Sequence, residues 1–176
     1  MKYIFFTILL FSAVGVNGQT MVMNDETTDV TFTTGHLAGR LEGTFKGTKG
    51  NIRLDSNNLA NSSLQFSFAS STLLQNDYLI GPNLVRASCF NAAQFPTIEL
   101  KSTSVTRLPA AKQYQFNGTL TVKGISKEIA FPFRATPNVG GYDLQFTFPI
   151  KKKYYNLTCP TTRQFKISVR GYAKKI

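Results

Sequence analysis

Residues 112–134 alternate between apolar and polar side chains over two neighbouring stretches, and this period of two constrains the fold more than any other feature. Such alternation places one kind of side chain on each face of a β-strand. Gly124 stands between the two stretches, where a tight turn would join them into a hairpin. Pro132 cannot donate a ladder hydrogen bond, so it predicts a bulge or a lightly paired edge in the second strand.

A two-stranded ribbon cannot bury its own apolar face, so other strands must close over this hairpin. The same alternation recurs, with turn signals between the runs, at residues 30–34, 64–69, 97–101, 142–150 and 165–170. The glycine-rich residues 41–54 favour one more hairpin, and only residues 83–92 favour a short helix. Seven to nine short strands of this kind predict an all-β antiparallel sandwich or barrel, with one short helix in the 81–95 region.

Residues 1–18 have the composition of a cleaved secretory signal. Lys2 precedes an apolar run that is too short to span a bilayer, and small residues follow it. An N-terminal anchor is the alternative, although no cysteine stands near the cleavage point for a lipid anchor. We predict cleavage after Gly18, one mature domain at residues 19–176, no transmembrane helix, and a periplasmic or secreted protein.

Positive charge is concentrated in the second half of the chain. Residues 101–176 carry fourteen Lys and Arg against two acidic residues, a net charge of +12, whereas residues 19–100 carry −2. This asymmetry favours an anionic partner, and for an exported chain an anionic membrane surface is favoured over nucleic acid. Lys151, Lys152 and Lys153 are the predicted membrane-surface contacts, and a basic protein without such a partner is the alternative.

The residues that usually carry catalysis are sparse. His36 is the only histidine, the nine carboxylates form no paired constellation, and no spacing suggests a metal site. Cys89 and Cys159 could form a disulfide after export, but small buried thiols are the default expectation. We therefore predict no catalytic residue, no metal and no enzyme activity.

Twelve of the fifteen phenylalanines lie beyond residue 18, and most of those on strands share the apolar parity. They would either line a tube or fill a core, and the pattern leaves both open. By this parity, with His36 and Tyr114 as polar candidates, the predicted ligand contacts are His36, Phe66, Phe68, Tyr114, Phe116, Ile129, Phe131, Phe133, Phe146, Phe148 and Phe165.

Four segments together resemble the YceI-like family of exported bacterial lipid-binding proteins. They are VTFTTGHL at 30–37, GTF with GNI at 43–52, NAAQFPTIEL at 91–100 and, most specifically, GTLTVKG at 118–124. The resemblance covers most of residues 19–176. Residues 76–84 lack the family's Arg-Asp-x-His signature, and residues 151–156 replace an Arg-Asp-Phe-Gly-like run, so the ligand headgroup transfers least.

The resemblance implies a lipocalin-like antiparallel β-barrel of about eight strands with an internal tunnel. It also implies non-enzymatic binding or transport of a long-chain apolar ligand, such as a polyisoprenoid, an isoprenoid quinone or a fatty-acid-like lipid, and no other cofactor. Two alternatives stay open: an enzyme acting on a lipid substrate, and a filled-core envelope protein for stress response or interaction. The oligomeric state is also open, a dimer included.

Overall fold

The structure, a computed structural model, describes residues 19–36, 39–75 and 81–176, without the side chains of residues 36, 72–75 and 81. The predicted signal at residues 1–18 lies outside this part of the chain. Besides three short helical elements, α1 (Gly81–Leu84), η1 (Leu59–Asn61) and η2 (Lys152–Tyr154), there are nine strands: β1 (Thr20–Asn24), β2 (Thr28–His36), β3 (Gly39–Arg53), β4 (Ser63–Gln75), β5 (Thr97–Arg107), β6 (Gln113–Val122), β7 (Ile125–Asn138), β8 (Gly141–Lys151) and β9 (Gln164–Lys175).

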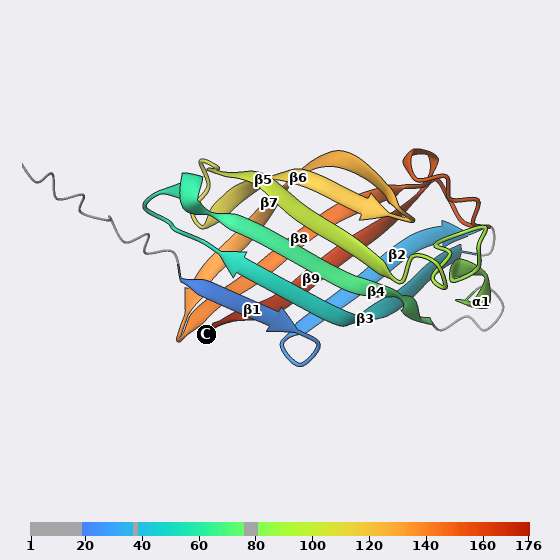
Figure 1. Cartoon of the computed structure of the whole chain (residues 1–176), viewed down its shortest axis with the longest axis horizontal. Helices are drawn as coiled ribbons and strands as arrows, with labels where there is room; N and C mark the ends of the chain where they lie inside the picture. The colour runs from blue at the N-terminus through green and yellow to red at the C-terminus, as the bar shows by residue number, and fades with distance from the viewer. Residues whose placement is uncertain (1–18, 37–38, 76–80) are drawn as a thin grey trace, which may run out of the picture.

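The strands form a closed antiparallel barrel, as Figure 1 shows from the side. From β2 the order around the wall is β2, β9, β8, β7, β6, β5, β4 and β3, and β3 pairs again with β2. The short β1 lies beyond the start of β2 in the same position, between β3 and β9. Nine strands therefore fill eight positions around the wall, which confirms the predicted all-β, lipocalin-like barrel.

The hairpin predicted for residues 41–54 is wrong, because β3 crosses this region as one strand of 15 residues. Gly47 adopts a positive φ of 70°, and the pairing with β4 shifts register between Thr44 and Lys46 and again between Lys46 and Lys49, the stretch that contains Gly47. The carboxylate of Asp25 accepts hydrogen bonds from the backbone N–H groups of Gly47 and Thr48, each at 2.8 Å. The glycine therefore forms a bulge whose donors are satisfied by the β1–β2 turn, and the strand continues.

The helix is shorter than predicted. It ends at Leu84, and residues 85–95 form turns in which backbone N–H groups reach back further than the four residues of an α-helix. Phe90 donates to the Leu84 carbonyl and Asn91 donates to the Arg86 carbonyl, both at about 3 Å. Asn91 also has a positive φ of 51°, which a helix does not permit. The sequence between 85 and 92 therefore builds a compact loop.

Two loops meet over one end of the barrel, and we call them together the lid: residues 85–96 between β4 and β5, and residues 152–163 between β8 and β9 (right in Figure 1). A disulfide joins Cys89 to Cys159, so the expectation of free thiols is wrong. Beside it, the carbonyl of Ser88 accepts hydrogen bonds from both the backbone N–H and the hydroxyl of Thr158, at 2.8 and 2.7 Å. Covalent and polar links thus fix the two loops to each other.

Candidate functional site

The interior of the barrel is lined by aromatic rings that form one continuous network. Each of ten phenylalanines has a ring centroid within 6.3 Å of another, and the chain of contacts includes Phe32, Phe45, Phe66, Phe68, Phe90, Phe116, Phe131, Phe146, Phe148 and Phe165. All ten are buried. A surface of this kind suits an apolar partner, because it offers dispersion contacts and almost no hydrogen-bonding groups.

One contact in this network crosses the barrel. Phe66 is on β4 and Phe146 is on β8, which are four positions apart around the wall and therefore opposite. Their ring centroids are 5.5 Å apart, with the rings at 83°. At this level the two walls touch through side chains, and a chain-like ligand could occupy the axis only if these rings turned aside.

The structure brings most of the predicted ligand contacts into the interior. The phenylalanines predicted as ligand contacts are all buried: Phe66, Phe68, Phe116, Phe131, Phe133, Phe146, Phe148 and Phe165. Ile129 is half-buried, near the lid end of β7. His36 pairs with Gly39 at the end of β2, and its side chain lies outside the described part. Their role as ligand contacts stays a prediction.

Tyr114 is less polar in its surroundings than the sequence indicated. Its ring stacks on Phe133 with centroids 5.4 Å apart, and the guanidinium of Arg107 lies 5.6 Å from the ring centroid. Arg107 in turn donates a 2.6 Å hydrogen bond to the carbonyl of Ser56 in the β3–β4 loop. This group lies toward the end of the barrel away from the lid.

Phe90 is an interior residue that sequence reasoning missed. It belongs to the lid, yet its ring reaches between the walls to within 5.2 Å of Phe165 on β9 and 6.3 Å of Phe45 on β3. Phe90 lies in a turn, where the alternation that identifies inward residues on strands does not apply. The neighbouring Cys89 was the only feature of the sequence that pointed to this loop. Tyr155 is also buried in the lid, and this burial raises its pKa to about 12. The lid therefore adds apolar surface to the interior.

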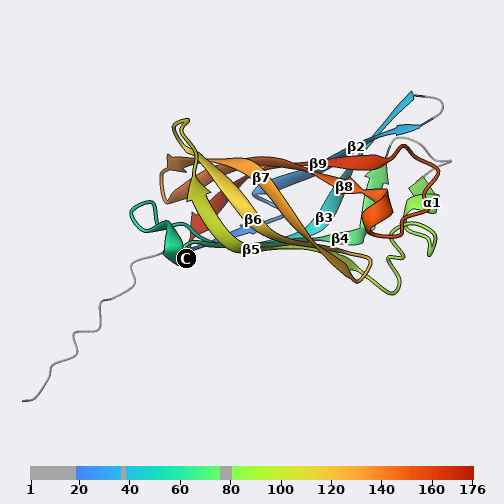
Figure 2. The same ribbon diagram turned by 90° about the horizontal axis from the view of Figure 1, so that it is seen from above.

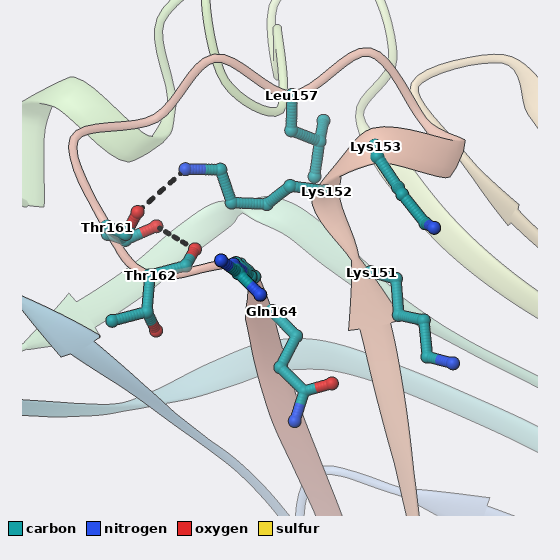
Figure 3. Close-up of a pocket in the computed structure, with 8 residues that line it drawn as sticks. Lys151, Lys152, Lys153, Leu157, Thr161, Thr162 and Gln164 are labelled. Carbon is teal, nitrogen blue, oxygen red and sulfur yellow. Dashed lines mark hydrogen bonds between the residues drawn. The ribbon is translucent and has the colours of Figure 1, made fainter.

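The outer wall next to the lid carries a basic pocket of about 740 Å³ (Figure 3). Its lining contains four cationic side chains and no carboxylate: Lys151, Lys152, Lys153, Leu157, Thr161, Thr162, Arg163 and Gln164. An ion pair joins Arg40 to Glu42, elsewhere on the barrel. The pocket therefore presents an excess of positive charge to solvent, which an anionic group could neutralise.

The three consecutive lysines do not play one role. Lys152 extends away from the other two, and its ammonium group donates to the carbonyl of Thr161 (Figure 3). The same group also donates to the carbonyl of Cys159 within the lid. Desolvation lowers the pKa of Lys152. Lys151 and Lys153 are exposed, and their nitrogens lie 5.8 and 4.9 Å from the ring centroid of Tyr154, itself 45% exposed. Lys151 and Lys153 are thus more exposed than Lys152, and the role of all three as membrane-surface contacts stays a prediction.

Catalytic chemistry has little to build on in this structure. The disulfide between Cys89 and Cys159 leaves neither sulfur available as a nucleophile. Within the described residues, no three His, Cys, Asp or Glu side chains gather where a metal ion could be held. A separate finding is that none of the described helices has the length and apolarity needed to cross a membrane.

A closed antiparallel barrel of eight positions with an apolar interior defines a lipocalin-like protein. The YceI-like domain matches residues 22–172 of this chain. The chain therefore belongs to the YceI-like family, which confirms the resemblance seen in the sequence. No curated protein matches the chain.

Three solved structures share this fold. BcnA from Burkholderia cenocepacia is 19% identical with a TM-score of 0.76, over 84% of this chain and 96% of BcnA. A polyisoprenoid binding domain from Saccharophagus degradans is 10% identical with a TM-score of 0.68, over 90% and 99% of the two chains. The YCEI protein of Campylobacter jejuni is 16% identical with a TM-score of 0.66, over 76% and 84%. At these identities the likeness concerns the fold.

Proposed function

We propose that this protein binds a long-chain apolar ligand, such as a polyisoprenoid or a fatty-acid-like lipid, inside the barrel and does not transform it. The observation that carries the proposal is the network of ten phenylalanines, which makes the inward face apolar from the lid to the middle of β6 and β7. Membership of the YceI-like family and the fold shared with a polyisoprenoid binding domain support the same class of ligand.

Binding in the interior requires the aromatic rings to move. Phe66 and Phe146 meet across the axis, so a bound chain would displace at least one of them. Such a change exchanges ring-to-ring contacts for ring-to-ligand contacts of similar strength, because both are dispersion contacts between apolar groups. The cost of opening is therefore offset by the ligand itself, and the ligand-free barrel is the collapsed form.

A filled-core protein without an internal ligand is the second candidate, and the same contact between Phe66 and Phe146 favours it. Native mass spectrometry of the protein purified from its own source distinguishes the two candidates. We expect an adduct that organic extraction removes and that a long-chain lipid restores. Repeated absence of any adduct, together with no uptake of long-chain lipids by the extracted protein, would leave the filled barrel.

An enzyme acting on lipid is tested separately. The triple change His36→Ala, Asp77→Ala and Cys89→Ala removes the only histidine, a carboxylate of the 76–84 segment and one cysteine, and a matched Cys89→Ala protein controls for loss of the disulfide. A binding protein keeps its lipid uptake at the level of the control and leaves the lipid chemically unchanged. Turnover of a lipid by the parent protein would contradict the proposal.

A further inference from the structure

The ladder between β7 and β8 covers only part of the two strands. It runs from Asn138↔Gly141 to Phe133↔Phe146 and stops, although both strands continue toward the lid. The neighbouring β6–β7 and β8–β9 ladders run on to the lid end. The wall therefore contains a region, residues 125–132 of β7 opposite residues 147–151 of β8, where no ladder joins the strands. We call this region the seam, and Figure 2 shows β7 and β8 diverging along it.

Two prolines explain why the ladder stops. Continuing the register of Phe133↔Phe146 would place Pro132 opposite Thr147, and then Ala130 opposite Pro149. The ladders on the outer sides run unbroken through both prolines, to Gln115 on β6 and to Lys166 on β9. In an antiparallel strand the N–H and C=O of one residue point to the same neighbour, so the missing donors of both prolines face the seam.

Each of these two positions would otherwise exchange a pair of hydrogen bonds, and each has lost one donor. Across from each proline, a carbonyl group has no N–H donor to accept from, and leaving it unpaired is tolerated only where water can reach it. With two such positions in succession, exposure of this stretch to water competes with strand pairing, and the ladder ends. The seam is therefore a built-in edge within a closed wall. Its two sides are held together at the lid end by Lys123, whose ammonium donates a 3.2 Å hydrogen bond to the carbonyl of Asn156.

The aromatic network lies immediately behind the seam. Phe131 belongs to the β7 side and Phe148 to the β8 side, and their rings stack with centroids 5.4 Å apart. Ile129, one position beyond Ala130 and Pro149 in the extended register, is half-buried against the core. A chain that parted the two strands would thus meet the interior rings directly. At the lid end, the disulfide and the Ser88–Thr158 hydrogen bonds hold the two described loops together, which opposes entry between them.

We propose that the apolar ligand passes into and out of the barrel sideways, through the seam between β7 and β8, and that Lys123 is the latch of this route. The inference rests on the proposed function, since it concerns the path to the same interior. A lateral route lets a long chain be laid in along its length, whereas an end-on route requires it to be threaded past the lid and Phe90.

The first experiment closes the seam. The double change Pro132→Thr with Pro149→Thr restores the two missing N–H donors with a residue that favours strands. Pro137→Thr is the matched control, because Pro137 also lies on β7 but in the half where the ladder with β8 is intact, opposite Tyr142. Amide hydrogen exchange should show new protection at Ala130 and Thr147 in the double variant only. Stopped-flow uptake and release of a fluorophore-tagged long-chain fatty acid should both slow several-fold, with the dissociation constant little changed, because a route alters the barrier and not the bound state.

The second experiment opens the latch. Lys123→Met keeps the side-chain length and removes the donor to Asn156, whereas Lys112→Met is its counterpart, a lysine that also has a positive φ in the hairpin turn at the other end of β6. Loss of one hydrogen bond from the closed seam should raise both rates about fivefold, which corresponds to about 1 kcal/mol. Lys112→Met should leave them unchanged.

The outcomes separate this inference from the proposed function. Amide hydrogen exchange of the ligand-free protein is the first test. Equal protection of the amides in the seam and in the paired half of β7 would overturn the inference of a lateral route. Unchanged uptake in a double variant whose ladder has extended would also overturn it, because the route would then lie elsewhere. A different result is that the parent protein binds the probe while the uptake and release rates stay the same in both the proline double variant and Lys123→Met. That result would keep the proposed function and reject the seam as the route. No binding at all would count against the proposed function, and the exchange measurement would still decide whether the seam opens.

Discussion

Phe66 on β4 and Phe146 on β8 project from opposite walls of the barrel, and their rings meet edge to face with centroids 5.5 Å apart. This contact joins the aromatic side chains of the two walls into one network. It also marks the level at which the collapsed and the ligand-filled forms of the interior would differ most.

Phe66→Ala and Phe146→Ala should each lower the free energy of unfolding of lipid-free protein by about 3–5 kcal/mol, because both rings are buried and a cavity would remain. A double-mutant cycle should show a coupling of about 0.5–1.5 kcal/mol between the two rings. Saturating long-chain lipid should reduce the loss, because a chain fills the cavity and binds only the folded state. Denaturant unfolding with and without lipid measures all three.

The control for this series is Phe133→Ala. Phe133 is equally buried but stacks on Tyr114, outside the ten-ring network, so lipid should rescue it less. An identical loss with and without lipid for Phe66→Ala would support a permanently filled core.

Phe131→Ala should also lower the free energy of unfolding by about 3–5 kcal/mol, because its ring stacks on Phe116, Phe146 and Phe148.

The lid disulfide should stabilise the protein substantially. Its cysteines are 70 positions apart, so the cross-link restricts a long stretch of the unfolded chain, and Cys89→Ser with Cys159→Ser should cost about 2–5 kcal/mol. Urea denaturation of the double variant should match that of the reduced parent protein. A reduced parent that unfolds at the same urea concentration as the oxidised one would contradict the expected contribution.

Asp25 should make stability depend on pH in the acid range. The slight desolvation of this exposed carboxylate would by itself raise its pKa, but the hydrogen bonds from the N–H groups of Thr48 and Gly47 outweigh that effect and lower the pKa below the ordinary value of 3.8. The folded state therefore takes up this proton at a lower pH than the unfolded state. Its stabilisation is fully present above about pH 4, near the ordinary pKa of Asp, and is lost as the pH falls through the folded pKa.

Asp25→Ala should cost about 1 kcal/mol at neutral pH, at the low end for hydrogen bonds to a charged group because Asp25 is exposed. The difference from the parent protein should shrink as the pH falls below 3.8. Glu26→Ala is the control, since it removes a neighbouring carboxylate outside the bulge contact. A difference that stays constant down to the acid limit would show that Asp25 acts through something other than its charged hydrogen bonds.

The basic pocket should bind anionic membranes. Changing Lys151, Lys153 and Arg163 to Gln should weaken binding to phosphatidylglycerol vesicles by about 1 kcal/mol per charge at low salt and flatten its salt dependence. The control triple, Lys112, Lys174 and Lys175 to Gln, removes the same charge at the opposite end of the barrel. Equal weakening by both triples would mean that only net charge matters and that the pocket has no special role.

Much of the barrel could be predicted because its strands read as local patterns. The alternation at residues 112–134 became β6 and β7, and Pro132 was recognised as a weak point in the pairing. The failures arose where distant residues decide the structure. Gly47 looks like a turn residue, but it forms a bulge because a carboxylate 22 residues away accepts its N–H group. No local pattern could supply that partner.

The candidate site was predicted less completely than the fold. Parity identified inward rings on strands but not Phe90, which reaches the interior from a loop. The three lysines looked alike in sequence, yet carbonyls of the lid hold Lys152 and leave its neighbours exposed. The seam depends on Pro132 and Pro149 interrupting the same ladder, and that became visible only when the register was known.

The barrel closes by pairing its second strand with its last. The hydroxyl of Thr31 on β2 donates to the carbonyl of Ser168 on β9, 137 residues later in the chain. During synthesis the growing sheet consequently keeps two open edges, on β2 and β8, until residues 164–175 have been added. Closure over so long a sequence separation makes folding slow compared with that of a protein built from local contacts. A chain that stops short of Gln164 has no means of sealing those edges, and it would be expected to aggregate through them.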